Sequence, residues 1–217
     1  MGRKSLGKNN KQKGILMIKV IIFDVDGVLL DDTKIFMRAY KETGRKLKLK
    51  IPSDSEIRKL FGLPWDEILL NMYGKLDEKM RDTYSEIINK AEMKTMKDLE
   101  YFLENLKMRK AIATSKSREN LEKHLKKFLK FFEVIITRYD TKKHKPDAEP
   151  LLSACEKLGI RPEEAVYIGD SLIDHEAARN AGVNFIGFVS GSASKEDFQK
   201  LNVKFVTSLK DLLKYLS

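Results

Sequence analysis

The chain has 217 residues, of which 42% are hydrophobic; this composition is typical of a globular protein with one sizeable core and excludes a disordered chain. Lys and Arg number 42 against 32 Asp and Glu, so the formal net charge is +10, as in many proteins that bind nucleic acid. Residues 1–14 hold five of these cations and no acid. Because half of the excess charge lies there, we expect a basic, disordered tail over residues 1–16 and no nucleic acid partner.

The single cysteine, Cys155, permits no internal disulfide and no multi-cysteine metal site, which suits a reducing compartment. The basic tail followed by GILMIKVIIF imitates a secretory signal, but Lys19 interrupts the apolar run and no small-residue cleavage site follows. No stretch approaches the ~20 apolar residues that a membrane helix needs. We therefore expect a cytoplasmic protein without a membrane partner, and Met17, just ahead of the first strand, is a candidate start.

The first predicted strand, residues 19–26 (KVIIFDVD), is apolar on both faces, which is typical of a central strand in a parallel sheet covered by helices. The pattern then changes, and residues 33–105 predict helices without any strand. The first of these helices is expected to end at Gly44, and Ser53 and Glu56 have the spacing of a capping box at the start of the next.

After this block, predicted strands and helices alternate. The strands are expected at 110–115, 133–138, 164–171, 184–189 and 203–207, and the helices at 117–132, 149–159, 173–182 and 208–216. Such alternation predicts an α/β fold: a doubly wound, Rossmann-like parallel sheet with right-handed crossovers. We assign residues 17–32 and 106–217 to this core, and residues 33–105 to an inserted all-helical domain with its connecting hinges.

Ligands bind outside the carboxyl ends of the strands in such a sheet, and Asp24 and Asp26 fall at the end of the first strand. Strand periodicity places these two acids on one face, about 6 to 7 Å apart. They would raise each other's pKa unless a cation intervened, and carboxylate ligands suit Mg²⁺. Gly27 lets the backbone turn tightly against a ligand. The alternative is a strand-to-loop junction with two solvated acids.

Three further polar clusters follow later strands, and each has a structural alternative. Thr114 and Ser115 offer hydroxyls and amides to a phosphate oxygen, or simply cap the next helix. Lys145 suits a phosphate dianion, although most lysines in this chain are expected to be solvated. Asp170 ends a buried strand, and Asp174, four residues on, lies near a helix start where a carboxylate can serve as a cap.

Taken together, the order of paired aspartates, hydroxyl, lysine and acidic loop resembles the four-motif pattern of the haloacid dehalogenase superfamily. The resemblance covers residues 18–34 and 108–216, and the helical block lies where that family inserts a helical cap. The spacing is most similar to phosphoglycolate phosphatases. This implies an Mg²⁺-dependent phosphatase that cleaves phosphate monoesters through an aspartyl-phosphate, with a small phosphorylated metabolite, phosphoglycolate-like or a sugar phosphate, as substrate.

The resemblance also implies roles for the residues that match its motifs. Asp24 would be the nucleophile, and Asp26 the general acid for the leaving alcohol and then the base for water. Mg²⁺ would be bound by the carboxylates of Asp24 and Asp170 and the backbone carbonyl of Asp26. Four further matches would hold the phosphoryl group: Gly27, Thr114, Ser115 and Lys145. Lys145 would also offset the charge of Asp24. Asp174 would support the metal, either through a bridging water or by orienting another ligand.

Some positions depart from the commonest family pattern, and they keep alternatives open. Val28 stands where many members have Thr and also occurs in hexose-phosphate mutases, so a phosphomutase is an alternative. Asp32 stands where many have Ser, and Ser115 where many have Asn. Asp26 itself argues against a true dehalogenase. A basic nucleic-acid-binding protein is the non-enzyme alternative, and the choice between monomer and dimer is open.

The stretch EIRKLFGLPWDEIL (residues 56–69) resembles the region of phosphoglycolate phosphatase caps that faces the active site. The resemblance makes four residues candidates for substrate contact: Arg58, Lys59, Leu63 and Trp65. The alternative, which burial statistics favour, is that Leu63 and Trp65 are core residues and that the two cations form a solvated face.

Overall fold

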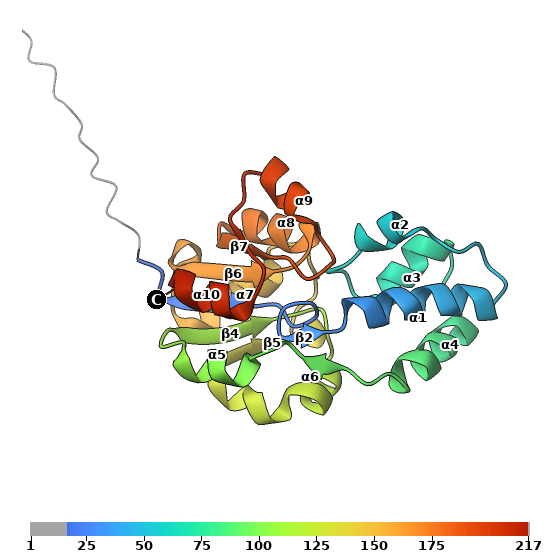
Figure 1. Ribbon diagram of the computed structural model, residues 1–217, viewed down its shortest axis with the longest axis horizontal. Helices are drawn as coiled ribbons and strands as arrows, with labels where there is room; N and C mark the ends of the chain where they lie inside the picture. Colours follow the sequence, from blue (N-terminus) through green and yellow to red (C-terminus); the bar gives the residue numbers. More distant parts are fainter. Residues whose placement is uncertain (1–16, 217) are drawn as a thin grey trace, which may run out of the picture.

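The computed structural model describes residues 17–216, so the predicted tail over residues 1–16 lies outside it. Within residues 17–216 the main sheet has six parallel strands in the order β5-β4-β1-β6-β7-β8 (Figure 1). The strands are β1 (Val20–Phe23), β4 (Arg109–Ala113), β5 (Val134–Ile136), β6 (Ala165–Gly169), β7 (Asn184–Phe188) and β8 (Phe205–Val206). The first strand is central, as its apolar sequence predicts, and the predicted doubly wound parallel sheet is confirmed.

Apolar side chains leave β1 alternately toward two faces of the sheet, and helices cover both. Ile21 and Phe23 pack into the cluster that includes α5 (Leu99–Asn105), α6 (Arg118–Leu125) and α10 (Leu209–Leu216). Val20 and Ile22 pack into the cluster that includes α7 (Glu149–Leu158) and α8 (Leu172–Ala181). Four shorter helical elements complete the core: η1 (Lys126–Phe131), η2 (Arg138–Asp140), η3 (Pro162–Glu164) and α9 (Lys195–Lys200).

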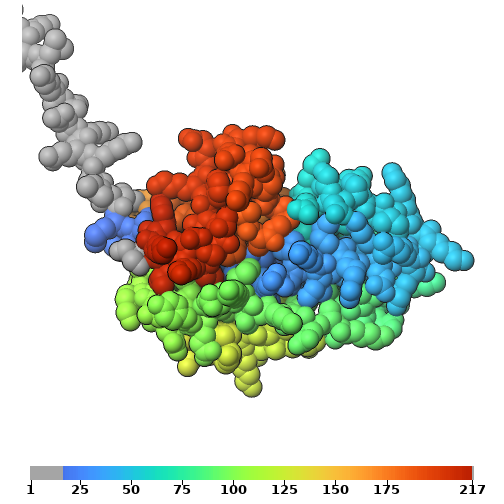
Figure 2. All heavy atoms as spheres, viewed as in Figure 1, coloured from blue at the N-terminus to red at the C-terminus, as the bar shows by residue number. Residues whose placement is uncertain are grey.

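Four helices form a separate hydrophobic cluster beside the sheet (Figure 1), and we call them the helical unit. They are α1 (Thr33–Lys46), α2 (Asp54–Arg58), α3 (Trp65–Tyr73) and α4 (Glu78–Asn89). Each helix contributes at least one buried side chain to this cluster, in chain order Tyr40, Ile57, Leu69 and Met80. The expected capping box of Ser53 and Glu56 starts α2. Figure 2 shows the helical unit in contact with the core rather than detached from it.

Residues 33–105 are not entirely helical, and the prediction of no strand there is wrong. β3 (Lys94–Thr95) pairs antiparallel with β2 (Leu30–Asp31), so the chain segments that enter and leave the helical unit lie side by side. Two residues are too short to show any periodicity in the sequence. α5 packs in a core cluster instead of the helical unit, so we place the end of the proposed inserted domain before Leu99.

Three predicted element boundaries are also wrong. α1 continues through Gly44 to Lys46; this glycine allows close packing rather than ending the helix, since an added Cβ would lie 2.4 Å from the Tyr73 hydroxyl. The helix predicted at 117–132 stops at Leu125 and continues as the 3₁₀ helix η1, and the strand predicted at 133–138 covers only Val134–Ile136. No helix in the described part of the chain is both long and apolar enough to cross a membrane.

Candidate active site

Three neighbouring strands, β4, β1 and β6, end at the same edge of the sheet, and a predicted site residue follows each of them: Thr114, Asp24 and Asp170. These residues line a cavity of about 380 Å³ together with Asp26 and Gly27. Residues of the helical unit form the opposite wall. The volume lies near the lower end of the usual range for ligand pockets, which fits a small metabolite.

Asp24 is 4% exposed, and its two carboxylate oxygens have different surroundings. Oδ2 lies 2.9 Å from Nζ of Lys145. Oδ1 is buried and has no hydrogen-bond partner among residues 17–216. Burial raises the pKa of Asp24 to about 6, since the nearby acids add to the effect of burial and Lys145 only partly offsets it. One oxygen is therefore fixed, and the other is free to meet a cation or a phosphorus atom.

Lys145 lies behind Asp24 and is almost fully buried. Its Nζ atom lies 2.6 Å from Oδ1 of Asp174 and donates a hydrogen bond to the Tyr167 hydroxyl at 3.0 Å. Burial lowers its pKa, but the charges of Asp174 and Asp24 outweigh burial and raise it above the usual value, so the side chain is a cation. Lys145 does not line the cavity, so in this structure it binds and orients Asp24.

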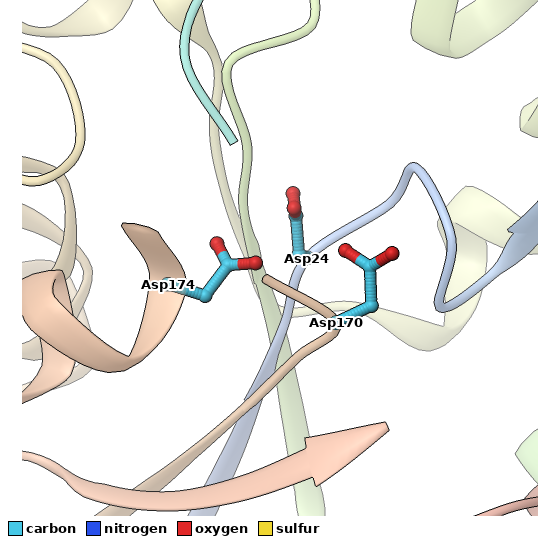
Figure 3. A group of neighbouring side chains, drawn as sticks. All are labelled: Asp24, Asp170 and Asp174. Atoms are coloured by element: carbon cyan, nitrogen blue, oxygen red, sulfur yellow. The ribbon is translucent and has the colours of Figure 1, made fainter. Parts of the chain in front are cut away.

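The carboxylates of Asp24, Asp170 and Asp174 converge (Figure 3), with one oxygen of each within 4.8 Å of the others. Burial and the neighbouring Asp174 charge raise the pKa of Asp170 well above its usual range. Raised pKa values in an acidic cluster indicate repulsion that a bound cation would relieve. The buried, unpartnered Oδ1 of Asp24 supplies a free ligand atom, so these residues fit a small divalent ion with oxygen ligands.

Asp174 has little capacity left for direct metal binding, because both of its oxygens already accept hydrogen bonds. Oδ1 accepts from Lys145, and Oδ2 accepts from the Ser171 hydroxyl at 2.6 Å and the Ser171 amide at 3.1 Å. The same pair forms a capping box at the start of α8. Asp174 therefore serves both as a helix cap and as a support of the site, because the hydrogen bonds of the cap fix the carboxylate that binds Lys145.

Gly27 has a positive φ of +74°, and a Cβ atom there would lie 2.1 Å from Oδ2 of Asp170. Only a glycine allows the loop after β1 to approach Asp170 so closely. Its amide is not free for a phosphate, because it donates a hydrogen bond of 3.0 Å to Oδ1 of Asp32. Gly27 thus shapes the cavity mainly through the absence of a side chain.

Lys116 is a site residue that the sequence analysis missed. Its Nζ atom lies 2.5 Å from Oδ1 of Asp26, it is 8% exposed, and it also lies over the Phe36 ring. Burial raises the pKa of Asp26, but the charge of Lys116, hydrogen bonds from Asp32 and Lys116, and the charge of Lys145 together outweigh burial, so the net pKa is lowered. The buried Asp32 lies close by, and burial raises its pKa well above the usual range. Only the position of Lys116 directly after Ser115 distinguishes it in the sequence from the many solvated lysines.

Thr114 and Ser115 lie at the cavity, but in different environments. Thr114 is buried, and its hydroxyl accepts a hydrogen bond from the Lys116 amide at 3.3 Å while keeping its own proton for a ligand. The Ser115 hydroxyl donates to the Gly62 carbonyl at 2.7 Å, so it already links the core to the helical unit. Thr114 is therefore the better placed of the two to donate to a phosphoryl oxygen.

Two further polar contacts join the helical unit to the core. Asp66 of α3 binds Arg138 of η2 through two parallel contacts of 2.6 and 2.8 Å. Arg58 donates to the Gly191 carbonyl. Together with the Ser115–Gly62 hydrogen bond, these contacts hold the helical unit against the core.

The helical unit contributes a largely aromatic wall. Leu63 and Trp65 line the cavity and also pack against the hydrophobic cluster of the helical unit. Both are therefore core residues as well as candidates for substrate contact. Arg58 and Lys59 do not line it. Phe36, Tyr40, Phe61 and Tyr84 also line it, and the sequence analysis did not single them out because helical spacing alone identifies them only as core residues.

Comparison with known proteins agrees with this geometry. Residues 21–188 match the profile of the haloacid dehalogenase-like hydrolases. A protein of Clostridium perfringens named "Putative pyrophosphatase PpaX" is 35% identical over 179 residues, which cover 79% of this chain and 84% of that protein. A phosphoglycolate phosphatase of Aquifex aeolicus is 29% identical over 197 residues, with coverage of 83% and 91%. The crystal structure of a "Putative haloacid dehalogenase-like hydrolase" from Bacteroides fragilis has a TM-score of 0.78 at 29% identity, covering 89% of this chain and 99% of that one.

Proposed function

Because the chain belongs to the haloacid dehalogenase-like hydrolase family, we propose that it is a phosphatase that forms a phosphoaspartate at Asp24 with the help of Mg²⁺. The family membership confirms the resemblance seen in the four motifs. The observation that carries the proposal is the asymmetry of Asp24, which lines the cavity and has one oxygen held by Lys145 and the other without a hydrogen-bond partner among the described residues. A carboxylate held in this way is oriented for attack on a phosphoryl group.

In the first half-reaction, one oxygen of the Asp24 carboxylate bonds to phosphorus as the bond from phosphorus to the substrate alcohol breaks. Asp26 gives its proton to the departing oxygen. Lys145 keeps Asp24 oriented, Asp174 keeps Lys145 in place, and the Thr114 hydroxyl donates to a phosphoryl oxygen.

In the second half-reaction, the Asp26 carboxylate takes a proton from water, whose oxygen bonds to phosphorus. The phosphoaspartate bond breaks, inorganic phosphate leaves and the Asp24 carboxylate is restored. Asp26 therefore acts as an acid in the first half-reaction and as a base in the second. Lys116 suits the second of these roles, because it holds Asp26 at the cavity wall as the carboxylate that accepts this proton, without occupying Asp24.

The carboxylates of Asp24 and Asp170, with the backbone carbonyl of Asp26, are the proposed ligands of Mg²⁺, and Asp174 supports them from behind. When bound, the metal supplies positive charge that reduces repulsion between the nucleophile and the phosphoryl group. The chain's own acids cannot supply this charge. The convergence of the Asp24 and Asp170 carboxylates and the unpartnered Oδ1 of Asp24 support the assignment.

The proposed substrate is the phosphate monoester of a small metabolite. Release of inorganic phosphate from a panel of such esters, with Mg²⁺ and with a chelator, tests the proposal. We expect release that depends on Mg²⁺ and is lost in Asp24→Asn. Full activity in Asp24→Asn would overturn the mechanism, and isomerisation of a sugar phosphate without net phosphate release would indicate the phosphomutase instead.

A further inference from the structure

We propose that the alcohol released by this enzyme is uncharged and bears several hydroxyl groups, as in a sugar phosphate, rather than carrying a second phosphate or a carboxylate. The inference rests on the proposed function, because it concerns the part of the substrate outside the transferred phosphoryl group. It follows from the charges, the ring arrangement and the hydrogen-bonding groups of the cavity wall formed by the helical unit and by the start of α6.

Two of the cations that line the cavity, the two least exposed, are already paired with carboxylates. Lys116 pairs with Asp26 at 2.5 Å, and Arg138 pairs with Asp66 through two contacts. A second anionic group on the substrate would have to compete with a carboxylate for either cation. Burial without a partner is costly for an anion, so this wall disfavours pyrophosphate and phosphoglycolate.

The two remaining basic side chains of the wall do not change this balance. Burial lowers the pKa of His124, and the charges of Lys116 and Lys123 lower it further, so the imidazole is neutral at pH 7. Lys123 is exposed at the rim, one turn after Glu119, which also lines the cavity. The wall therefore offers no net positive charge beyond the region that holds the phosphoryl group.

The aromatic residues of the wall turn much of their ring faces toward each other. Tyr84 stacks on Trp65, with centroids 5.1 Å apart and an interplanar angle of 3°, and on Tyr40, with centroids 5.0 Å apart and an angle of 19°. The Arg81 guanidinium lies over the Trp65 ring. These contacts occupy ring faces of Tyr84 and Trp65, so the stack is poorly suited to bind a flat aromatic group by stacking.

The same wall supplies uncharged hydrogen-bonding groups. The Tyr84 hydroxyl is buried and makes no hydrogen bond of normal geometry among the described residues, although the Tyr40 hydroxyl is close enough to perturb its pKa. Ser85, Asn89 and Asn120 also line the cavity. A buried hydroxyl without a partner is unfavourable, and a substrate hydroxyl would satisfy it. Neutral donors and acceptors of this kind complement a polyol.

The test compares kcat/KM for ribose 5-phosphate, 2-phosphoglycolate, pyrophosphate and the general probe p-nitrophenyl phosphate, all with Mg²⁺. We expect ribose 5-phosphate to exceed both anionic substrates by about tenfold or more, since unpaired charge is rejected by a site built for neutral groups. A preference for pyrophosphate or 2-phosphoglycolate, with p-nitrophenyl phosphate still cleaved, would overturn this inference alone. Failure to cleave any of the four would overturn the proposed function as well.

Tyr84→Phe removes the unpaired hydroxyl and keeps the ring stack. We expect the ratio of kcat/KM for ribose 5-phosphate to kcat/KM for p-nitrophenyl phosphate to fall about 3- to 10-fold, as for one lost neutral hydrogen bond. Tyr73→Phe is the matched control, because the Tyr73 hydroxyl donates to the Tyr40 carbonyl in the same helical unit but does not line the cavity. An unchanged ratio between the two substrates in Tyr84→Phe would contradict the assignment of the wall to a hydroxylated leaving group.

Discussion

The ammonium nitrogen of Lys116 lies 2.5 Å from Oδ1 of Asp26, and both residues belong to the wall of the active-site cavity. The contact fixes the acid that moves the proton in the proposed reaction. It also explains why the pKa of Asp26 is lowered although burial alone would raise it.

Lys116→Met should therefore impair catalysis through Asp26. Without its cation, the buried carboxylate changes position, so we expect kcat/KM for an alkyl phosphate, whose leaving oxygen needs the proton of Asp26, to fall about 10²-fold, as for a displaced catalytic group. Steady-state kinetics with an alkyl phosphate and with p-nitrophenyl phosphate measure this, and kcat/KM for the latter should fall much less because nitrophenolate leaves without a proton. Lys110→Met is the control, because Lys110 is a similarly buried lysine that bonds the Met108 carbonyl away from the cavity. Equal kinetics in the two variants would contradict this role for Lys116.

Asp26→Asn should separate the two half-reactions. Nitrophenolate leaves without protonation, so Asp24 can still be phosphorylated by p-nitrophenyl phosphate. The second half-reaction then lacks its base and should slow by about 10² to 10⁴-fold. Rapid mixing should show a burst of nitrophenolate equal to the enzyme concentration, followed by slow turnover. A linear time course at a reduced rate would show instead that Asp26 acts before phosphoryl transfer.

Gly27→Ala should destroy the site by steric overlap with Asp170. The new Cβ atom would lie 2.1 Å from a carboxylate oxygen, and the backbone has a φ of +74°. Gly74→Ala is a matched control, since Gly74 has a φ of +69° but no atom within 4 Å of the added Cβ. Both substitutions should cost about 1 to 2 kcal/mol in backbone strain. Only Gly27→Ala should also weaken Mg²⁺ activation of phosphate release, and equal metal titrations for both would be evidence against the close approach.

Asp66→Asn should loosen the helical unit from the core. The Asp66–Arg138 pair is largely buried and doubly bonded, so we expect the free energy of unfolding at pH 7 to fall by about 1.5 to 3 kcal/mol and KM to rise. Glu86→Gln, at an exposed ion pair with Lys90, should leave the free energy of unfolding nearly unchanged, because solvent screens the pair. Urea unfolding of wild type and the two variants measures both effects.

The stability difference between wild type and Asp66→Asn should also depend on pH. Burial raises the pKa of Asp66, but the hydrogen bonds and charge of Arg138 outweigh burial and lower it below its usual value. As the pH falls, the unfolded chain therefore binds the proton first, near pH 4. The contribution of the pair should be complete above that pH and be lost as the pH falls through the lower native pKa. A stability difference between wild type and Asp66→Asn that grows as the pH falls would contradict this prediction.

Much of the fold was predictable because its patterns are long. The apolar run before Asp24 indicated the central strand, and strand-helix alternation after residue 108 indicated the parallel sheet. The end of each strand then placed Asp24, Thr114 and Asp170 at one edge. The β2–β3 pair escaped detection because a two-residue strand carries no periodicity, and its pairing joins segments far apart in sequence.

The rest of the site depends on tertiary contacts that spacing does not encode. Lys116 becomes a site residue only because the loop after β4 turns it toward Asp26, and Tyr84 only because α4 packs beside the cavity. The structure also shows that the Gly27 amide and the Ser115 hydroxyl, which the sequence offers to a phosphate, are already engaged with Asp32 and Gly62.

The most direct test of the central claim is to locate the covalent phosphate. Asp26→Asn enzyme is mixed with p-nitrophenyl phosphate and Mg²⁺, quenched in acid, digested and analysed by mass spectrometry. The peptide that contains Asp24 should carry one phosphoryl group on that residue, and the Asp24→Asn, Asp26→Asn double variant should carry none. Phosphate on another residue, or phosphate release without any phosphorylated peptide, would contradict Asp24 as the nucleophile.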